Sequence, residues 1–124
     1  MFQFPKKQKL CSEKEIEKLF VSSNFIVERP LKVIWILKKN TDDVSVKTLV
    51  VVSKKKIKLA VERNFIKRRI KESYRLHKNK LEAFLKTHKC QLNLAIIYQH
   101  NKKLDYKTID MKINLLVNRL IKKL

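Results

Sequence analysis

The chain has 124 residues, with 31 Lys and Arg against 11 Asp and Glu, and a formal net charge of +20 at pH 7. Glycine is absent, which excludes the glycine-rich phosphate loops of nucleotide-binding folds and the nucleophile elbow of hydrolases, because those motifs need glycine where the backbone turns or approaches a phosphate. The length suits one domain, residues 1–124, and the charge predicts a polyanionic partner, of which nucleic acid is the commonest.

The N-terminal part of the chain predicts a basic arm followed by a short helix. Residues 1–9 are basic and contain a proline, which favours an extended arm. Ser12 stands three residues before Glu15, the spacing of a capping box, and predicts an amphipathic helix over 13–21. Asn24 is the best left-handed residue available to end this helix in the absence of glycine.

Three strands and two further helices are predicted after this helix. Residues 31–38 and 44–52 are rich in β-branched side chains and predict a hairpin around a turn at 40–43, and 25–27 carry a weaker strand pattern. Apolar spacings of three and four residues predict a helix over 60–86, the apolar run at 91–98 predicts a buried central strand, and Thr108 is placed to cap a final helix. The apolar face of that helix consists of Ile109, Ile113, Leu116, Val117, Leu120 and Leu124.

Half of the net charge lies in residues 54–80, which hold eight Lys and four Arg against only Glu62 and Glu72. On a helical wheel, six polar side chains share an arc of about 140° that no acidic residue interrupts: Arg63, Asn64, Lys67, Arg68, Lys71 and Arg75. A solvated helix usually interleaves Glu with Lys four residues apart. The pattern therefore favours a surface that follows a phosphate backbone, extended by the lysines at 54–56.

Residues 60–71, AVERNFIKRRIK, closely resemble the signature of the bacterial ribonuclease P protein component, approximately A-V-x-R-N-x-x-K-R-x-x-R/K. That signature follows a strand ending in S/P-K-K, and SKKK stands in this place at 53–56. The resemblance covers roughly residues 8–122. It implies an α+β fold, an α-β-β-β-α-β-α sandwich with helices on a four-stranded sheet and a left-handed βαβ crossover, as in the second domain of a small-subunit ribosomal protein.

The resemblance also implies which residues bind RNA. The catalytic RNA of ribonuclease P would contact Lys55, Lys56, Arg63, Asn64, Lys67, Arg68, Lys71 and Arg75. A cleft between the first helix and the sheet would bind the single-stranded 5′ leader of precursor tRNA through Ile16, Phe20 and Trp35, because exposed aromatic side chains stack on unpaired bases. On the residue pattern alone, Phe20 and Trp35 fit a core position as well as a cleft.

Three positions depart from the family's pattern. Ile16 replaces a frequent Phe, which leaves apolar contact there but no stacking. Phe65 replaces a residue that is often Arg, next to Asn64. Lys58 stands where many members have Gly, so the connection before the long helix must turn without glycine, or must not turn sharply.

The chain carries no recognisable catalytic or metal-binding constellation. His77, His88 and Cys90 lack zinc-ligand spacing, and no Ser-His-Asp or Cys-His arrangement is discernible. By resemblance, we expect the protein subunit of an endoribonuclease that removes the 5′ leader of precursor tRNA. Its catalytic groups and Mg²⁺ would lie mainly in the RNA, with no protein-held metal and no small-molecule cofactor.

Two alternatives come from other classes of protein. One is a basic ribosomal or nucleoid-type nucleic-acid-binding protein without linked catalysis. The other is a self-sufficient nuclease, which would need clustered carboxylates on the RNA-facing surface. The two distant cysteines, Cys11 and Cys90, are expected to be reduced, and without a signal-peptide or membrane-span pattern we expect a cytoplasmic protein with no membrane partner.

Overall fold

The computed structural model describes residues 10, 12–39 and 46–124. Within them the elements follow in the order α1 (Glu13–Phe20), β1 (Phe25–Glu28), β2 (Leu31–Lys39), β3 (Val46–Val52), α2 (Ala60–Thr87), β4 (Cys90–Tyr98) and α3 (Tyr106–Lys123). This is the predicted α-β-β-β-α-β-α order, and the weak pattern at 25–27 is a strand. The arm at 1–9, Cys11 and the turn at 40–43 lie outside the described residues.

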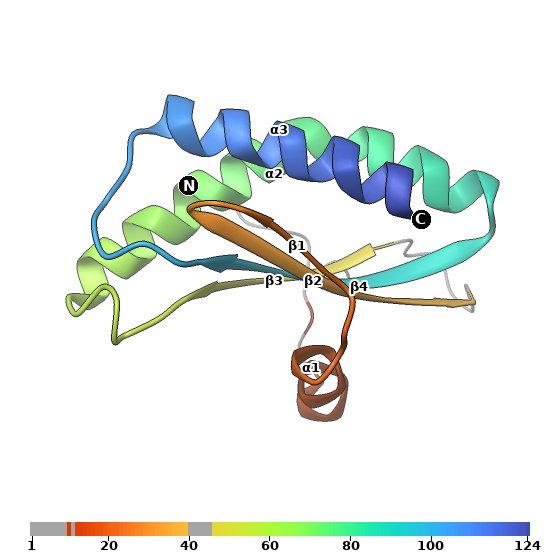
Figure 1. Cartoon of the computed structure of the whole chain (residues 1–124), viewed down its shortest axis with the longest axis horizontal. Helices are drawn as coiled ribbons and strands as arrows, with labels where there is room; N and C mark the ends of the chain where they lie inside the picture. Colours follow the sequence, from red (N-terminus) through yellow and green to blue (C-terminus); the bar gives the residue numbers. More distant parts are fainter. Residues whose placement is uncertain (1–9, 11, 40–45) are drawn as a thin grey trace.

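The strands form one mixed sheet in the order β1-β2-β4-β3. The predicted hairpin of 31–38 with 44–52 is wrong, because β4 lies between β2 and β3 and β2 forms its hairpin with β1. β4 pairs antiparallel with β2 on one side and parallel with β3 on the other. Its side chains from Leu94 to Ile96 are apolar on both faces because helices cover both faces of the sheet there. The parallel pair is joined through α2, so β3, α2 and β4 form the expected βαβ unit, whose left-handed sense stays a prediction. Helices α2 and α3 lie on one face of the sheet and α1 lies on the other (Figure 1).

The sheet separates two apolar clusters of different size. The large core lies between the sheet and the helices α2 and α3, and it includes Ile66, Ile70, Tyr74, Leu81, Ile109 and Leu116. The small cluster lies on the α1 face and is formed by Leu10, Leu19, Ile34 and Ala95. Because side chains alternate along a strand, Val33 and Trp35 of β2 point into the large core while Ile34 and Ile36 point toward α1.

The ends of the helices confirm one predicted cap and correct two other assignments. The Ser12 hydroxyl accepts a hydrogen bond from the Glu15 N–H at 3.4 Å, as the capping box predicts. The predicted cap at Thr108 is wrong, since Asp105 caps α3 by accepting from the Thr108 N–H at 3.0 Å. This hydrogen bond lowers the pKa of Asp105, and a carboxylate also suits the positive end of the helix dipole.

The prediction that Asn24 ends the first helix in the left-handed conformation is wrong, and a left-handed residue follows α2 instead. Among the non-glycine residues that the structure describes, Lys89 alone has a positive φ, 53°. It follows the C-cap of α2, and its N–H donates to the Lys86 carbonyl at 3.2 Å. A residue with a Cβ costs about 1 kcal/mol more than glycine in this conformation, so the chain accepts a small local cost at the end of its longest helix.

Candidate nucleic-acid interface

The six polar residues of the predicted arc lie on the solvent-facing side of α2. Asn64 and Arg68 are exposed and the other four are partly exposed, whereas Ile66 and Ile70 on the opposite side are fully buried. We call this set, Arg63, Asn64, Lys67, Arg68, Lys71 and Arg75, the basic arc. The helical period therefore brings all the predicted residues of α2 onto one accessible surface, as expected.

The turn before α2 forms without glycine, through Ser53 and Arg63. The Ser53 hydroxyl accepts from the Lys55 N–H at 3.1 Å, and the Ser53 carbonyl accepts from the N–H groups of Lys56 and Ile57 at 3.2 and 3.0 Å. The Arg63 guanidinium then donates to the carbonyls of Ile57 and Lys58 at 2.9 and 2.8 Å. Arg63 thus holds the exposed lysines of the turn beside the N-terminal end of α2, a role that the sequence did not reveal.

Ion pairing divides the basic arc into compensated and uncompensated cations. Arg75 pairs with Glu72 at 2.7 Å, and this hydrogen bond raises the pKa of the guanidinium. Arg68 makes no hydrogen bond or ion pair with the residues that the structure describes. Arg68 therefore offers an uncompensated fork to an anion, whereas at Arg75 an anion would compete with a carboxylate.

Phe65 joins α2 to the connection between β4 and α3. The Arg69 guanidinium lies 4.1 Å from the centre of the Phe65 ring, and the Lys103 ammonium lies 5.0 Å from it. Arg69 also donates to the Leu104 carbonyl at 2.5 Å. The side chain that departs from the family's pattern therefore serves cation–π packing here, and it orients two cations beside the basic arc.

The α1 face of the sheet carries exposed apolar side chains beside lysines. Ile16 packs at the margin of the small cluster, while Phe20 and Phe25 are 48% and 51% exposed. The Lys32 ammonium lies 5.0 Å from the centre of the Phe25 ring. On this face α1 is anchored by the Lys38–Glu15 pair at 2.8 Å, which lowers the pKa of Glu15. Exposed rings with neighbouring cations suit an unpaired RNA strand.

Trp35 does not belong to this face, and its predicted grouping with Ile16 and Phe20 is wrong. It is 6% exposed and packs in the large core on the side of α2 and α3. The structure instead places Phe25 and Lys32 on this face, two residues that the sequence interpretation did not name. The weak strand pattern at 25–27 was the available signal, since it placed an aromatic side chain at the start of an edge strand.

A Ser, an Asp and a His meet between α2 and α3 without forming a nucleophile and its base. The buried Ser73 hydroxyl donates to Asp110 Oδ1 at 2.6 Å, and His77 Nε2 lies 2.9 Å from the same oxygen. Burial raises the pKa of Asp110, but the hydrogen bonds from Ser73 and His77 outweigh it and leave the pKa below its usual value. Because serine bonds to the aspartate and not to the histidine, this cluster joins two helices and does not activate a hydroxyl.

The described residues offer no metal site and no membrane span. No three His, Cys, Asp or Glu side chains in residues 10, 12–39 and 46–124 lie close enough together to hold a metal ion. None of the helices in these ranges is long and apolar enough to cross a bilayer.

Comparison with known proteins identifies the family. A family model described as Ribonuclease P matches residues 4–121. The ribonuclease P protein component of Porphyromonas gingivalis is 29% identical over 109 residues, which cover 88% of this chain and 80% of that protein. The component of Pseudomonas fluorescens is 35% identical over 78 residues, or 63% of this chain and 57% of that protein.

Solved structures support the same assignment at the level of the fold. The RNase P protein of Staphylococcus aureus superimposes with a TM-score of 0.68 at 20% identity, covering 91% of this chain and 94% of that one. The protein of Thermotoga maritima gives a TM-score of 0.67 at 21% identity, covering 90% and 96%. With a family match that spans nearly the whole sequence and a common fold, the chain belongs to the ribonuclease P protein component family.

Proposed function

We propose that this chain binds the catalytic RNA of ribonuclease P through the basic arc and the lysines at 54–56, and that it binds the 5′ leader of precursor tRNA on the α1 face. The observation that carries the proposal is the exposed basic arc, in which Arg68 has no carboxylate partner among the described residues. Guanidinium and ammonium groups along one helix face suit a run of phosphates. The complex then removes the leader to leave the mature 5′ end.

The chain's own contribution to cleavage is binding and charge neutralisation. Mg²⁺ would be held mainly by the RNA, since the described residues bring no carboxylate cluster to the basic arc. Cations of the protein reduce the repulsion between catalytic RNA and precursor tRNA, which both carry one negative charge per nucleotide. With that repulsion reduced, the RNA subunit needs less Mg²⁺ to hold its substrate.

Reconstitution tests the proposed function. The protein mixed with its cognate catalytic RNA at low Mg²⁺ is expected to raise the rate of 5′ cleavage of precursor tRNA well above that of the RNA alone. High Mg²⁺ should narrow the difference, because the metal then supplies the screening that the protein gives at low Mg²⁺. RNA binding without any rise in cleavage would favour the basic ribosomal or nucleoid-type alternative, and cleavage by the protein alone would favour the nuclease.

Phe20→Ala tests leader binding on the α1 face. The affinity of the reconstituted complex for precursor tRNA should fall by about 1–3 kcal/mol, because one base loses its stacking partner. Affinity for mature tRNA, which has no leader, should stay unchanged. Val21→Ala is the matched control, since Val21 is 84% exposed and adjacent in sequence. An equal loss for both tRNAs would contradict a leader contact at Phe20.

A further inference from the structure

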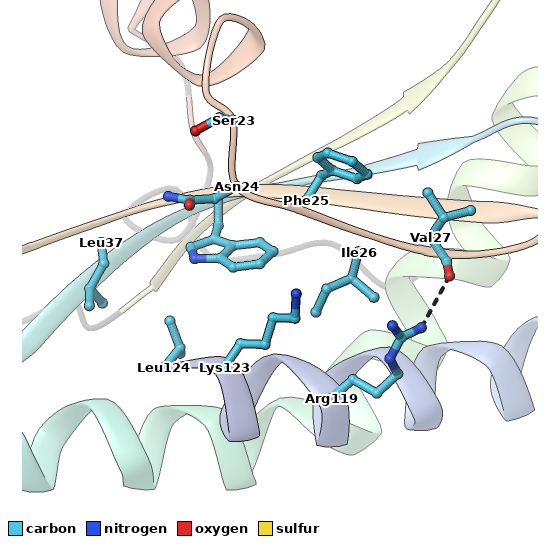
Figure 2. Close-up of a pocket in the computed structure, with 10 residues that line it drawn as sticks. Ser23, Asn24, Phe25, Ile26, Val27, Leu37, Arg119, Lys123 and Leu124 are labelled. Atoms are coloured by element: carbon cyan, nitrogen blue, oxygen red, sulfur yellow. Dashed lines mark hydrogen bonds between the residues drawn. The ribbon is translucent and has the colours of Figure 1, made fainter.

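A pocket of about 680 Å³ opens at the β1 edge of the sheet, between the α1–β1 connection and the C-terminal end of α3. Ser23 and Asn24 line it from the side of α1, Leu37 lines it from β2, and Lys123 and Arg119 line it from α3 (Figure 2). Trp35 is part of the same lining. The pocket therefore lies at the edge of the sheet, with Phe25 on the side of α1 and Trp35, Leu37 and α3 on the other side. Its volume is in the range that accommodates a small organic ligand.

The lining combines flat apolar surface with positive charge. Trp35, Phe25 and Leu37 supply the apolar part, and no Asp or Glu side chain belongs to the lining. Arg119 is held in place, since its guanidinium donates to the Val27 carbonyl at 3.1 Å and to Glu28 Oε2 at 2.7 Å. Lys123 makes no ion pair with the residues that the structure describes, and its side chain extends from α3 toward the sheet (Figure 2).

We propose that this pocket binds one unpaired nucleotide of an RNA strand, with the base against Leu37 and the exposed edge of Trp35, the phosphate at Lys123, and Phe25 at the rim that faces α1. The inference rests on the proposed RNA-binding function and adds a second strand-binding site to it. Every base has a flat face that can pack against an aromatic side chain, whatever the RNA sequence. The phosphate of the nucleotide needs a cation without a competing carboxylate. A neutral ligand would leave the charge of Lys123 unused.

The route into the pocket is continuous with the α1 face. Phe20 ends α1, residues 21–24 connect it to β1, and Phe25 begins β1 and lines the pocket. Ser23 and Asn24, on that connection, form its rim beside Phe25 (Figure 2). A strand that stacks on the exposed rings of Phe20 and Phe25 therefore reaches the pocket by crossing the edge of the sheet at Asn24.

The pocket contains its own spectroscopic probe, because Trp35 is the single tryptophan of the chain. A ten-nucleotide single-stranded RNA carrying a fluorescent label is titrated into the full-length protein at low salt. The anisotropy of the label reports binding anywhere on the protein, and the fluorescence of Trp35 reports occupancy of the pocket. We expect the Trp35 signal to change in a saturable manner.

Lys123→Glu and Lys122→Glu form a matched pair. Both change the net charge equally at neighbouring positions, but Lys122 is exposed and does not line the pocket. We expect Lys123→Glu to raise about tenfold the RNA concentration that produces half of the change in Trp35 fluorescence, since it replaces a phosphate contact with repulsion. Lys122→Glu should leave this RNA concentration close to the value for the unmodified protein.

The remaining outcomes separate the pocket from the proposed function. If the anisotropy rises while Trp35 fluorescence stays constant, no nucleotide enters the pocket and the proposed pocket site is wrong. RNA binding by the basic arc is then unaffected. If both lysine substitutions reduce the change in Trp35 fluorescence equally, the proposed pocket site is also wrong, because the change then reflects overall charge. Failure of the RNA to bind at all contradicts the proposed function as well.

Discussion

Trp35→Ala is expected to lower the free energy of unfolding by about 3–5 kcal/mol, the usual cost of removing a large aromatic side chain from a core. Trp35 is 6% exposed and packs in the cluster that joins the sheet to α2 and α3. Its loss leaves a cavity between β2 and α3 that the surrounding backbone cannot fully close. Urea unfolding followed by circular dichroism measures the effect without relying on the tryptophan signal.

Phe25→Ala is the matched control for this prediction. Phe25 is an aromatic residue of the adjoining strand and also lines the pocket, but it is 51% exposed. Its replacement should change the free energy of unfolding by less than about 1 kcal/mol. Equal stability losses in the two variants, or an unfolding midpoint for Trp35→Ala that matches the unmodified protein, would contradict the assignment of Trp35 to the core.

The error over Trp35 has a physical origin in β2. The strand reads LKVIWILKK, and its residues from Val33 to Ile36 are apolar without interruption because helices cover both faces of the sheet at this point. Alternation of polar and apolar residues normally reveals which side chains face the core. Where both faces are covered, the alternation disappears, so the sequence predicted the strand and left open the face on which Trp35 lies.

The basic arc could be predicted because its residues are local to one helix. Ile66 and Ile70 set the orientation of α2, and Asn64 and Arg68 then have to face solvent. Contacts between segments that are distant in the sequence could not be predicted in this way. The hydrogen bonds of Asp110 to Ser73 and His77 join residues more than 30 positions apart, and no spacing in the sequence indicates them. The Arg63 contacts with the carbonyls of 57 and 58 depended likewise on how the turn folds back.

The largest effect on RNA binding is expected from reversing two adjacent charges of the basic arc, in Lys67→Glu/Arg68→Glu. Neither side chain makes an ion pair with the described part of the chain, so their removal should leave the free energy of unfolding within about 1 kcal/mol. Affinity for the catalytic RNA should fall at least about 100-fold, because two charge-assisted contacts are lost and two repulsions appear. The slope of log affinity against log salt concentration should become shallower by about 2.

Lys80→Glu/Lys122→Glu is the control for that double reversal, since it produces the same net charge. Lys80 is exposed on α2 outside the basic arc and Lys122 is exposed on α3. If long-range attraction alone held the RNA, both double variants would lose affinity and salt dependence equally, because each removes the same charge from a protein at +20. A loss confined to Lys67→Glu/Arg68→Glu means that phosphates contact the basic arc itself. Equal losses would reduce the arc to one contributor to a diffuse field and would contradict its assignment as the interface.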